Sequence, residues 1–322
     1  MYTDQDGVLR VRCWLSGYAD DIYLGVSGGS WQKLVRLANV AAGCVVRSIE
    51  RLGLEVAPQK TQATFFFDRR ASGSPPEGLS LRINGVKVQI TLHMRYLGMW
   101  LDGPRSFGEH VARVAPRAVK MANNLARFLP NIGGASGGVR RLYVATFHSV
   151  LLYAAPIWWE RLARSVTLSA RMAAAQRIIA NRAARAYRTV SHVGATILAG
   201  IPPVTLIAES YAKTYDDVKA IKARLGVVRV PERIRGKLRL QNAEILLQKW
   251  KTFLENPNLM GRRIREAVQP VLEGWMERKK SRYLTFHASQ VPRIAMESSH
   301  LITGVGVIKL SFFDQPWIYS YA

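Results

Sequence analysis

Cysteine is scarce in this sequence. Its 322 residues include two cysteines, Cys13 and Cys44, which cannot form a disulfide framework or, by themselves, a structural zinc site. Chains with so few thiols are typical of reducing compartments. The sequence therefore predicts an intracellular protein, in the nucleus or the cytoplasm, that is not secreted.

Long apolar runs are absent as well. The longest covers residues 149–159, is too short to span a bilayer and is interrupted by Pro156. The first residues of the chain have neither the basic nor the apolar region of a signal peptide. We therefore expect no signal peptide, and no membrane among the partners.

Acidic side chains are few relative to basic ones. The chain has 46 Lys and Arg residues against 22 Asp and Glu residues, which gives a formal net charge of +24 and a pI near 10.6. Because such an excess repels itself, it favours a polyanionic partner, of which nucleic acid is the commonest. An anionic membrane surface is the rival partner, but no lipidation signal accompanies the charge. The hydrophobic fraction of 48% is that of a globular chain.

Two of the scarce carboxylates, Asp20 and Asp21, are adjacent. They follow residues 8–15, which alternate apolar and polar, and they precede a second strand-like run at residues 22–26. This pattern predicts a β-hairpin with an acidic turn. Asp suits turns because it hydrogen-bonds to its own backbone, so the pair has a purely structural explanation. Alternatively, both carboxylates hold divalent ions, because nucleotidyl transfer needs hard oxygen ligands for Mg²⁺.

A helix and several strands are predicted after the acidic turn. Apolar residues at spacings of three and four predict a helix over residues 31–52, which Gly53 ends as a left-handed cap. A loop that contains Lys60 leads to a predicted strand at residues 62–67. Two further strands are predicted at residues 81–86 and 88–92.

Three short motifs follow one another in this part of the chain: YADD at residues 18–21, GL…KT within residues 52–61, and YLG at residues 96–98. They resemble the YxDD box, the motif that follows it and the primer-grip hairpin of reverse transcriptases encoded by non-LTR (LINE-type) retrotransposons. In that family the YxDD box is the second catalytic carboxylate motif. Each motif is weak alone, but three of them in the right order and spacing are specific together.

This resemblance implies roles for particular residues. Asp20 and Asp21 would be catalytic and would hold Mg²⁺, with Mn²⁺ as an alternative ion. Lys60 would lie near the phosphates of the incoming dNTP and protonate the leaving pyrophosphate. The primer grip would consist of Tyr96, Leu97 and Gly98. On the residues alone, Lys60 is more simply a solvated surface lysine, and Tyr96 and Leu97 are core residues, which is compatible with a primer-grip role.

Residues 111–208 contain 13 Arg or Lys residues and a single acid, Glu160. Helices are predicted from the capping-box residue Ser106 to Pro130, and then over residues 140–155 and 167–188. A solvated face normally mixes charges of both signs, so phosphate contact explains this region better. The predicted nucleic-acid-binding residues are Arg140, Arg141, Arg171, Arg177, Arg182, Arg185 and Arg188.

Two segments of this basic region indicate which branch of the non-LTR elements the chain resembles. LLYAAPIW at residues 151–158 and AYRTVS at residues 186–191 are similar to stretches of the Pol polyproteins of jockey-like, insect type-1 retrotransposable elements. The resemblance extends over residues 8–306 and is strongest before residue 210. It implies an RNA template and a DNA primer as partners, and no small-molecule cofactor beyond the dNTP.

The sequence also departs from the family pattern. Residues 301–306 resemble a segment that leads into a zinc knuckle, but Val305 and Val307 replace the expected His and Cys. The family's first catalytic Asp belongs to an earlier palm strand, and only 17 residues precede Tyr18. The resemblance likewise leads us to expect neither the family's fingers nor its endonuclease domain within these 322 residues. The two-metal site would therefore lack a ligand, and we expect this chain to be inactive on its own.

The predicted fold class is α+β, in three parts. Residues 1–104 would form the C-terminal half of a reverse-transcriptase palm, with a small antiparallel sheet, one covering helix and the primer-grip hairpin. Residues 105–208 would form a basic helical thumb or connector, and residues 209–322 a mostly helical, degenerate C-terminal region without a zinc knuckle. A palm cut through its sheet exposes a strand edge, so self-association is expected. The alternatives to an enzyme fragment are a non-enzymatic nucleic-acid-binding remnant and the product of a decayed reading frame.

Overall fold

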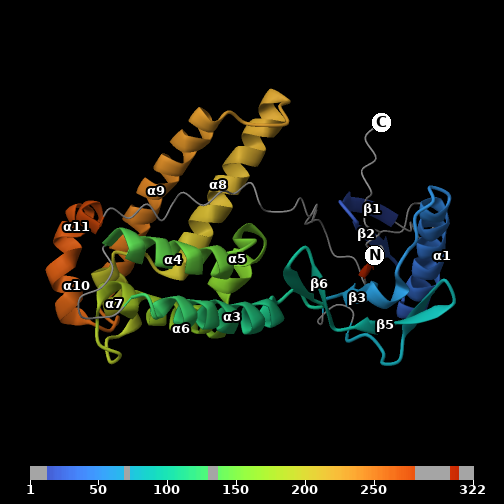
Figure 1. Cartoon of the computed structure of the whole chain (residues 1–322), viewed down its shortest axis with the longest axis horizontal. Helices are drawn as coiled ribbons and strands as arrows, with labels where there is room; N and C mark the ends of the chain where they lie inside the picture. Colours follow the sequence, from blue (N-terminus) through green and yellow to red (C-terminus); the bar gives the residue numbers. More distant parts are fainter. Residues whose placement is uncertain (1–12, 69–72, 130–136, 280–304, 312–322) are drawn as a thin grey trace. The chain divides into compact units, whose positions relative to one another are not determined.

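The structure, a computed structural model, describes residues 13–68, 73–129, 137–279 and 305–311 (Figure 1). The chain divides into two compact units. The first extends to His110 and also takes in the C-terminal segment, whereas the second covers Val111–Val291. Strands and one long helix build the first unit, and helices alone build the described part of the second. The predicted α+β class is therefore confirmed.

The first unit contains a six-stranded sheet with the order β1-β2-β8-β3-β5-β4. Strands β2 and β3 each pair with β8 in antiparallel fashion, while β3 and β5 are parallel. The sheet is therefore mixed, not purely antiparallel as predicted. Its strands are β1 (Cys13–Tyr18), β2 (Asp21–Ser27), β3 (Gln62–Phe66), β4 (Ser80–Ile83), β5 (Val86–Thr91) and β8 (Val305–Ser311).

Strand β8 occupies the centre of this sheet, although it comes from the other end of the chain. It joins the β1–β2 hairpin to the group formed by β3, β5 and β4. Strand β8 satisfies the backbone N–H and C=O groups on the side of β2 that faces away from β1. Among the described strands, β1 and β4 lie at the two edges of the sheet, so self-association through a strand edge stays a prediction. The expected helical tail also needs correction at this point, since residues 305–311 form a strand.

Helix α1 (Trp31–Glu50) covers one face of the sheet. It begins at Ser30, whose hydroxyl accepts a hydrogen bond from the Lys33 backbone N–H at 3.4 Å. Its apolar stripe is buried against strand residues that include Leu24 and Phe65. Successive strand residues point to opposite faces, so Asp21 and Tyr23 lie on the face that α1 does not cover. The predicted helix is confirmed, and it ends two residues earlier than expected.

A second, two-stranded hairpin follows the sheet. Strand β6 (His93–Tyr96) pairs with β7 (Met99–Asp102). Its two-residue turn consists of Leu97 and Gly98, with φ values of 46° and 83°. After it, Asp102 accepts hydrogen bonds from the Ser106 and Phe107 backbone N–H groups at 2.9 and 2.7 Å. This buried carboxylate fixes the chain where helix α3 (Gly108–Ala126) begins.

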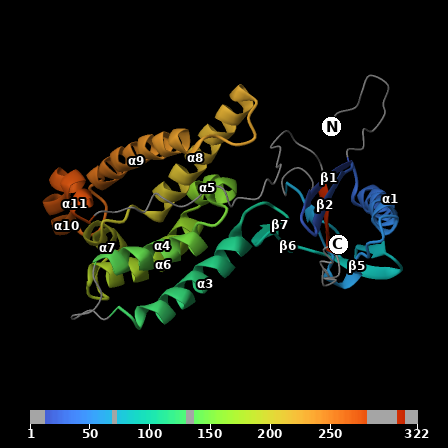
Figure 2. The same ribbon diagram turned by 45° about the horizontal axis from the view of Figure 1, so that its top comes forward.

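Helix α3 continues into the second unit, which is helical throughout its described residues. Helix α6 contacts α4, α5, α7 and α8, and a further core at one end includes the fully buried Trp250 and Leu272. Helices α8 and α9 run side by side (Figures 1 and 2). The helices are α4 (Gly137–Leu151), α5 (Ala155–Arg164), α6 (Val166–Ala184), α7 (His192–Ala199), α8 (Val204–Leu225), α9 (Glu232–Glu255), α10 (Arg262–Val268) and α11 (Leu272–Lys279).

Among the described residues, no single helix is both long and apolar enough to cross a bilayer. Two bent pairs, α4 with α5 and α7 with α8, have the required length and composition together. Several apolar side chains of these pairs, such as Phe147 and Ile197, are buried within the helical unit.

Candidate functional site

The acidic turn forms the tip of the β1–β2 hairpin. Tyr18 pairs with Asp21, which leaves Ala19 and Asp20 as a two-residue turn. Ala19 adopts the left-handed conformation, with a φ of 52°. Asp20 is exposed and Asp21 is half-buried. The predicted hairpin is confirmed, with the first strand running further into the motif than expected; residues 8–12 of that predicted strand lie outside the described residues.

Asp21 lies close to the tyrosine of the YLG motif. The rings of Tyr23 and Tyr96 meet with their centroids 5.0 Å apart, and Tyr23 shares a strand face with Asp21. Burial, and then the negative charge of Asp21, raise the pKa of Tyr96. Burial, and then the neighbouring Tyr96, raise the pKa of Tyr23. The structure therefore brings two motifs together that are more than seventy residues apart in the sequence, and keeps both phenols neutral.

Lys60 lies at the same edge of the sheet as Asp21. Strands β2 and β3 are both antiparallel to β8, so they are parallel to each other and begin at one edge. Asp21 pairs with Ser311, and Gln62 pairs with Lys309. Lys60 is exposed, is the last residue of a short 3₁₀ turn, and is separated from the start of β3 by Thr61. Because β8 stands between β2 and β3, these two strands are roughly 10 Å apart, which is two strand spacings.

The β6–β7 hairpin is tied to the same sheet. The Arg95 backbone N–H donates to Gln62 Oε1 at 2.9 Å, and the Phe67 N–H donates to the Gly103 carbonyl at 3.1 Å. Tyr96 is buried, whereas Gly98 is exposed at the tip of the turn. The core interpretation of Tyr96 is therefore correct as far as its burial is concerned. A primer contact by this turn stays a prediction.

Two residues of the site are missing from the sequence-based prediction. Tyr23 carries the ring that contacts Tyr96, and Gln62 holds the backbone of β6. The alternation of strand β2 was the available signal for Tyr23, because it places residues 21 and 23 on one face. Gln62 offers no such signal, since its partner is 33 residues away.

Three of the predicted nucleic-acid-binding arginines donate to backbone carbonyls of the helical unit. Arg140 is buried, and its guanidinium donates to the Arg182 carbonyl at 2.8 Å. Arg177 donates to the Val190 and Arg188 carbonyls, each at 2.7 Å. The half-buried Arg182 donates to the Leu129 carbonyl at 3.4 Å. Burial, followed by the charges of two neighbouring arginines, lowers the pKa of the Arg140 guanidinium. Because it is buried, Arg140 does not lie on an exposed basic face. Its guanidinium instead donates to a carbonyl in the last turn of α6, where the regular hydrogen bonds of the helix end.

The remaining predicted arginines are more accessible. Arg171, Arg185 and Arg188 are exposed, and Arg141 is half-buried. Helix α3 adds three exposed basic residues that precede them in the sequence, Arg113, Arg117 and Lys120, and the exposed Arg127 follows its last residue. Phosphate contact by the exposed residues stays a prediction.

A metal ion would find only part of a ligand set here. Asp20 and Asp21 offer hard oxygen ligands of the kind that Mg²⁺ prefers. Within the described part of the chain, no three or more His, Cys, Asp or Glu residues are grouped so that they could hold an ion. Val305 and Val307, which stand where a zinc knuckle would have ligands, belong to β8. The two carboxylates therefore fit a site that takes further ligands from elsewhere.

Known proteins share sequence similarity with this chain. The chain is 31% identical over 210 residues, or 64% of its length, to a putative 115 kDa protein in the type-1 retrotransposable element R1DM of Drosophila melanogaster. It is 26% identical over 200 residues to the Pol polyprotein of the type-1 retrotransposable element R1 2 of Nasonia vitripennis. Its homologues are R1 retrotransposon Pol polyproteins. The resemblance to a non-LTR retrotransposon protein is thereby confirmed.

The R1 relatives are longer than this chain. The chain spans 20% of the Drosophila protein and 48% of the R1 2 polyprotein. A third relative, the R1 4 polyprotein of Nasonia vitripennis, is 22% identical over 233 residues, and the chain spans 59% of it. No family model matches the chain, and no solved structure matches it.

Proposed function

We propose that this R1-related chain is part of an RNA-directed DNA polymerase, in which Asp20 and Asp21 supply carboxylate ligands to catalytic Mg²⁺, or to Mn²⁺ in its place. One observation carries the proposal. The acidic pair occupies a hairpin tip beside Tyr96 of the YLG turn, in a chain whose homologues are Pol polyproteins. Bound ions of this kind stabilise the attacking and leaving oxygens of nucleotidyl transfer.

The protein groups around the ions would position the reactants. Strand pairing on both sides of β2 fixes the backbone of Asp21, so its carboxylate is held in place before substrate arrives. Lys60, at the same edge of the sheet, brings a positive charge to the triphosphate of the dNTP. The YLG turn, with Leu97 and Gly98 at its tip, would contact the DNA primer, and the basic helices would bind the RNA template.

The proposed site takes a further carboxylate from a longer polyprotein. The described residues provide two adjacent carboxylates at the hairpin and no larger ligand group. Two ions held about 4 Å apart need more ligands than this pair supplies. The 322-residue chain is accordingly proposed to be inactive on its own.

Primer extension with an RNA template, a DNA primer, dNTPs and Mg²⁺ tests the proposal. We expect no product from the 322-residue chain and extension by a longer polyprotein that contains it. In that polyprotein, Asp20→Ala and Asp21→Ala should each reduce the rate by roughly three orders of magnitude, because the metal ions stabilise the transition state by several kcal/mol.

The exposed carboxylate Glu77 supplies a matched control, and Glu77→Ala should leave the rate unchanged. Extension at the full rate by both Asp variants would refute the metal-ligand role. Extension by the 322-residue chain, lost in Asp20→Ala, would refute the proposed inactivity and keep the metal role.

A further inference from the structure

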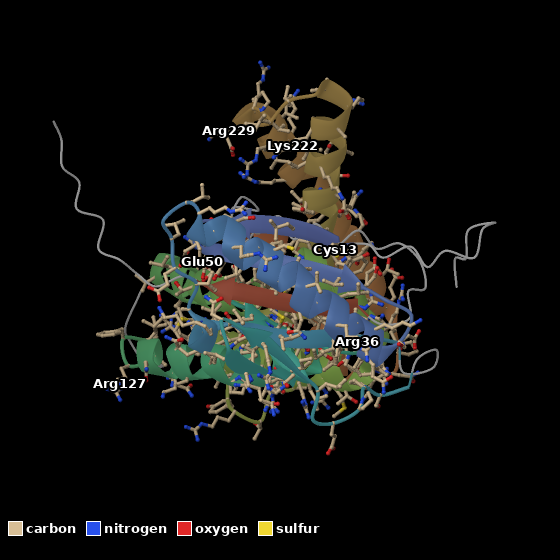
Figure 3. The ribbon with its side chains drawn as sticks, turned by 90° about the vertical axis from the view of Figure 1, so that its right-hand side faces the viewer. Cys13, Arg36, Glu50, Arg127, Lys222 and Arg229 are labelled. Carbon is tan, nitrogen blue, oxygen red and sulfur yellow. The ribbon has the colours of Figure 1, made fainter. Side chains whose placement is uncertain are left out.

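The free end of the α8–α9 helix pair concentrates positive charge. Residues 218–241, here called the α8–α9 tip, contain eight Lys or Arg residues and a single acid, Glu232. They comprise the end of α8, the connecting turn and the first part of α9. Figure 3 labels Lys222 and Arg229 in this part of the molecule. None of the predicted arginines of residues 140–188 belongs to the tip.

The tip has a defined backbone. Gly226 ends α8 in the left-handed conformation, with a φ of 63°, and Pro231 caps the start of α9. Below the tip, the buried Asn242 side chain donates to Thr214 Oγ1 at 3.1 Å and to Asp217 Oδ2 at 2.9 Å. These bonds fasten the two helices together. Residues 223–229 are all exposed beyond them.

Most of the positive charge at the tip lacks a counter-charge. Glu232 forms ion pairs with Arg235 at 3.5 Å and with Arg239 at 2.7 Å. Across the described residues, no ion pair involves the other cations of the turn and its flanks. Four of these are exposed, and a polyanion would relieve their mutual repulsion. They are Arg224, Arg229, Arg233 and Lys237.

We propose that the α8–α9 tip binds the phosphate backbone of double-helical RNA. The proposal rests on the proposed function, and it assigns a surface to the RNA partner. Residues 218–241 contain no aromatic side chain, so the tip has no platform on which unpaired bases could stack. Lysine and arginine side chains, by contrast, contact phosphates without regard to base sequence.

The breadth of the tip favours RNA over DNA. Two adjacent helices are about 20 Å across, because each is about 10 Å in diameter with its side chains. This exceeds the roughly 12 Å width of the major groove of B-form DNA. An A-form RNA duplex instead presents a wide, shallow minor groove between its phosphate strands. A blunt basic element fits such a surface without entering a narrow groove.

The test compares the wild-type 322-residue chain with a variant that carries Arg224→Gln, Arg229→Gln, Arg233→Gln and Lys237→Gln. Binding to an RNA duplex of about 20 base pairs, longer than the roughly 16 that a double-stranded-RNA-binding domain spans, is measured by fluorescence anisotropy over a range of salt concentrations. We expect at least about ten-fold weaker binding at 0.1 M salt, and a slope of log K against log salt that is smaller by roughly 3.

A control variant removes the same charge from exposed positions of the first unit, through Lys33→Gln, Arg36→Gln, Arg51→Gln and Lys87→Gln. Both variants should keep the wild-type thermal midpoint, since all eight side chains are exposed. The control should bind RNA within about three-fold of the wild type, because the tip is intact.

The outcomes separate the tip from the function proposed above. Equal affinity of the two variants would overturn the tip as the RNA site, while the wild type still bound RNA. The wild type is also tested with a DNA duplex of the same sequence and with anionic vesicles. If it binds either of these more tightly than RNA, and the tip variant loses that binding too, the choice of RNA is overturned. Absence of any nucleic-acid binding by the wild type would overturn the function itself.

Discussion

Gln176 shows how single side chains hold the helical unit together. It is fully buried, and its amide nitrogen donates to the Pro202 carbonyl at 2.9 Å and lies 3.3 Å from His148 Nε2. Its amide oxygen lies 2.9 Å from both the Val204 backbone nitrogen and His192 Nε2. One side chain thus joins residues of α4, α6 and α7 to the start of α8. A buried polar cluster of this kind is stabilising only while its members remain neutral and paired.

The two histidines of this cluster make stability depend on pH. Burial lowers the pKa of His148 to about 4, and burial together with the charge of Arg177 lowers that of His192 to about 4. Both are neutral when folded, whereas the unfolded chain takes up protons near pH 6.5. Stability should be fully present above about pH 6.5 and fall toward pH 4, by on the order of 2 kcal/mol per histidine near pH 5. Urea unfolding near pH 7.5 and pH 5 measures the difference.

The variant His192→Gln provides the control for this pH dependence. Its amide can still donate toward Gln176 but does not titrate. The loss of stability between the two pH values should shrink, leaving mainly the His148 contribution and that of His110, whose pKa burial also lowers to about 4. A variant with the same loss as the wild type would rule out His192 as a titrating group.

The predictability of the site residues depends on how local their interactions are. The sequence predicts the turn at Asp20 and Asp21 because both flanking strands lie within a few residues of it. It does not predict that Tyr96 meets Tyr23 or that Arg140 is buried. Those contacts depend on how separate elements pack, and a basic residue in a helical pattern has the same sequence signature whether it faces solvent or a carbonyl.

Among the elements, the presence of a helix is predicted better than the point at which one helix ends and the next begins. Apolar periodicity identifies α1 and α6 to within a few residues of their ends. The predicted helix over residues 140–155 instead ends at Leu151, Ala154 turns left-handed with a φ of 56°, and α5 begins at Ala155. Pro156 fits the first turn of a helix, so it can mark a new start as readily as an end. Periodicity alone does not distinguish the two.

The junction between β3 and the β6–β7 hairpin depends on a glycine. A Cβ at Gly103 would lie 2.5 Å from a ring carbon of Phe67 and 2.7 Å from the Phe65 carbonyl oxygen. The Phe65 carbonyl belongs to the backbone of the sheet and cannot move aside as the end of a flexible side chain can. Gly103→Ala should therefore destabilise the chain by about 1–3 kcal/mol. Chemical denaturation, followed by intrinsic tryptophan fluorescence, measures the change.

Gly236 is the matched control for this substitution. It lies within α9, and a Cβ there would have no atom within 4 Å. Gly236→Ala should stabilise the chain by about 0.5–1 kcal/mol, because alanine loses less conformational entropy in a helix. Similar effects of the two changes would show that the close approach at Gly103 does not matter for stability.

For the whole molecule, β8 is the feature that sequence patterns miss. Its alternating residues have strand character, but nothing in them specifies a place between β2 and β3. Register and neighbours in a sheet are set by long-range pairing, which local periodicity does not encode. The sequence consequently does not predict that β8 lies between β2 and β3.

Ile308→Pro tests the central position of β8. Ile308 pairs with Leu24 of β2 and with Ala63 of β3. Proline removes a backbone donor and is tolerated poorly in central strands. Hydrogen exchange should show faster exchange of the β2 and β3 amides, whereas the amides of α6 in the helical unit should keep their protection.

The conservative change Ile308→Val retains the backbone donor and the β-branched side chain. It should leave exchange in β2 and β3 close to that of the wild type. Full protection of both strands in the proline variant would mean that they do not depend on β8, and the order of the sheet would have to be revised.

The central place of β8 also determines the order in which the two units can fold during synthesis on the ribosome. The helical unit is continuous in sequence and can form as soon as it emerges, but the sheet must wait for its last strand. Translation from Phe66 to Val305 takes roughly 10 to 50 s at about 5–20 residues per second. During that interval the facing sides of β2 and β3 are available to chaperones or to other nascent chains.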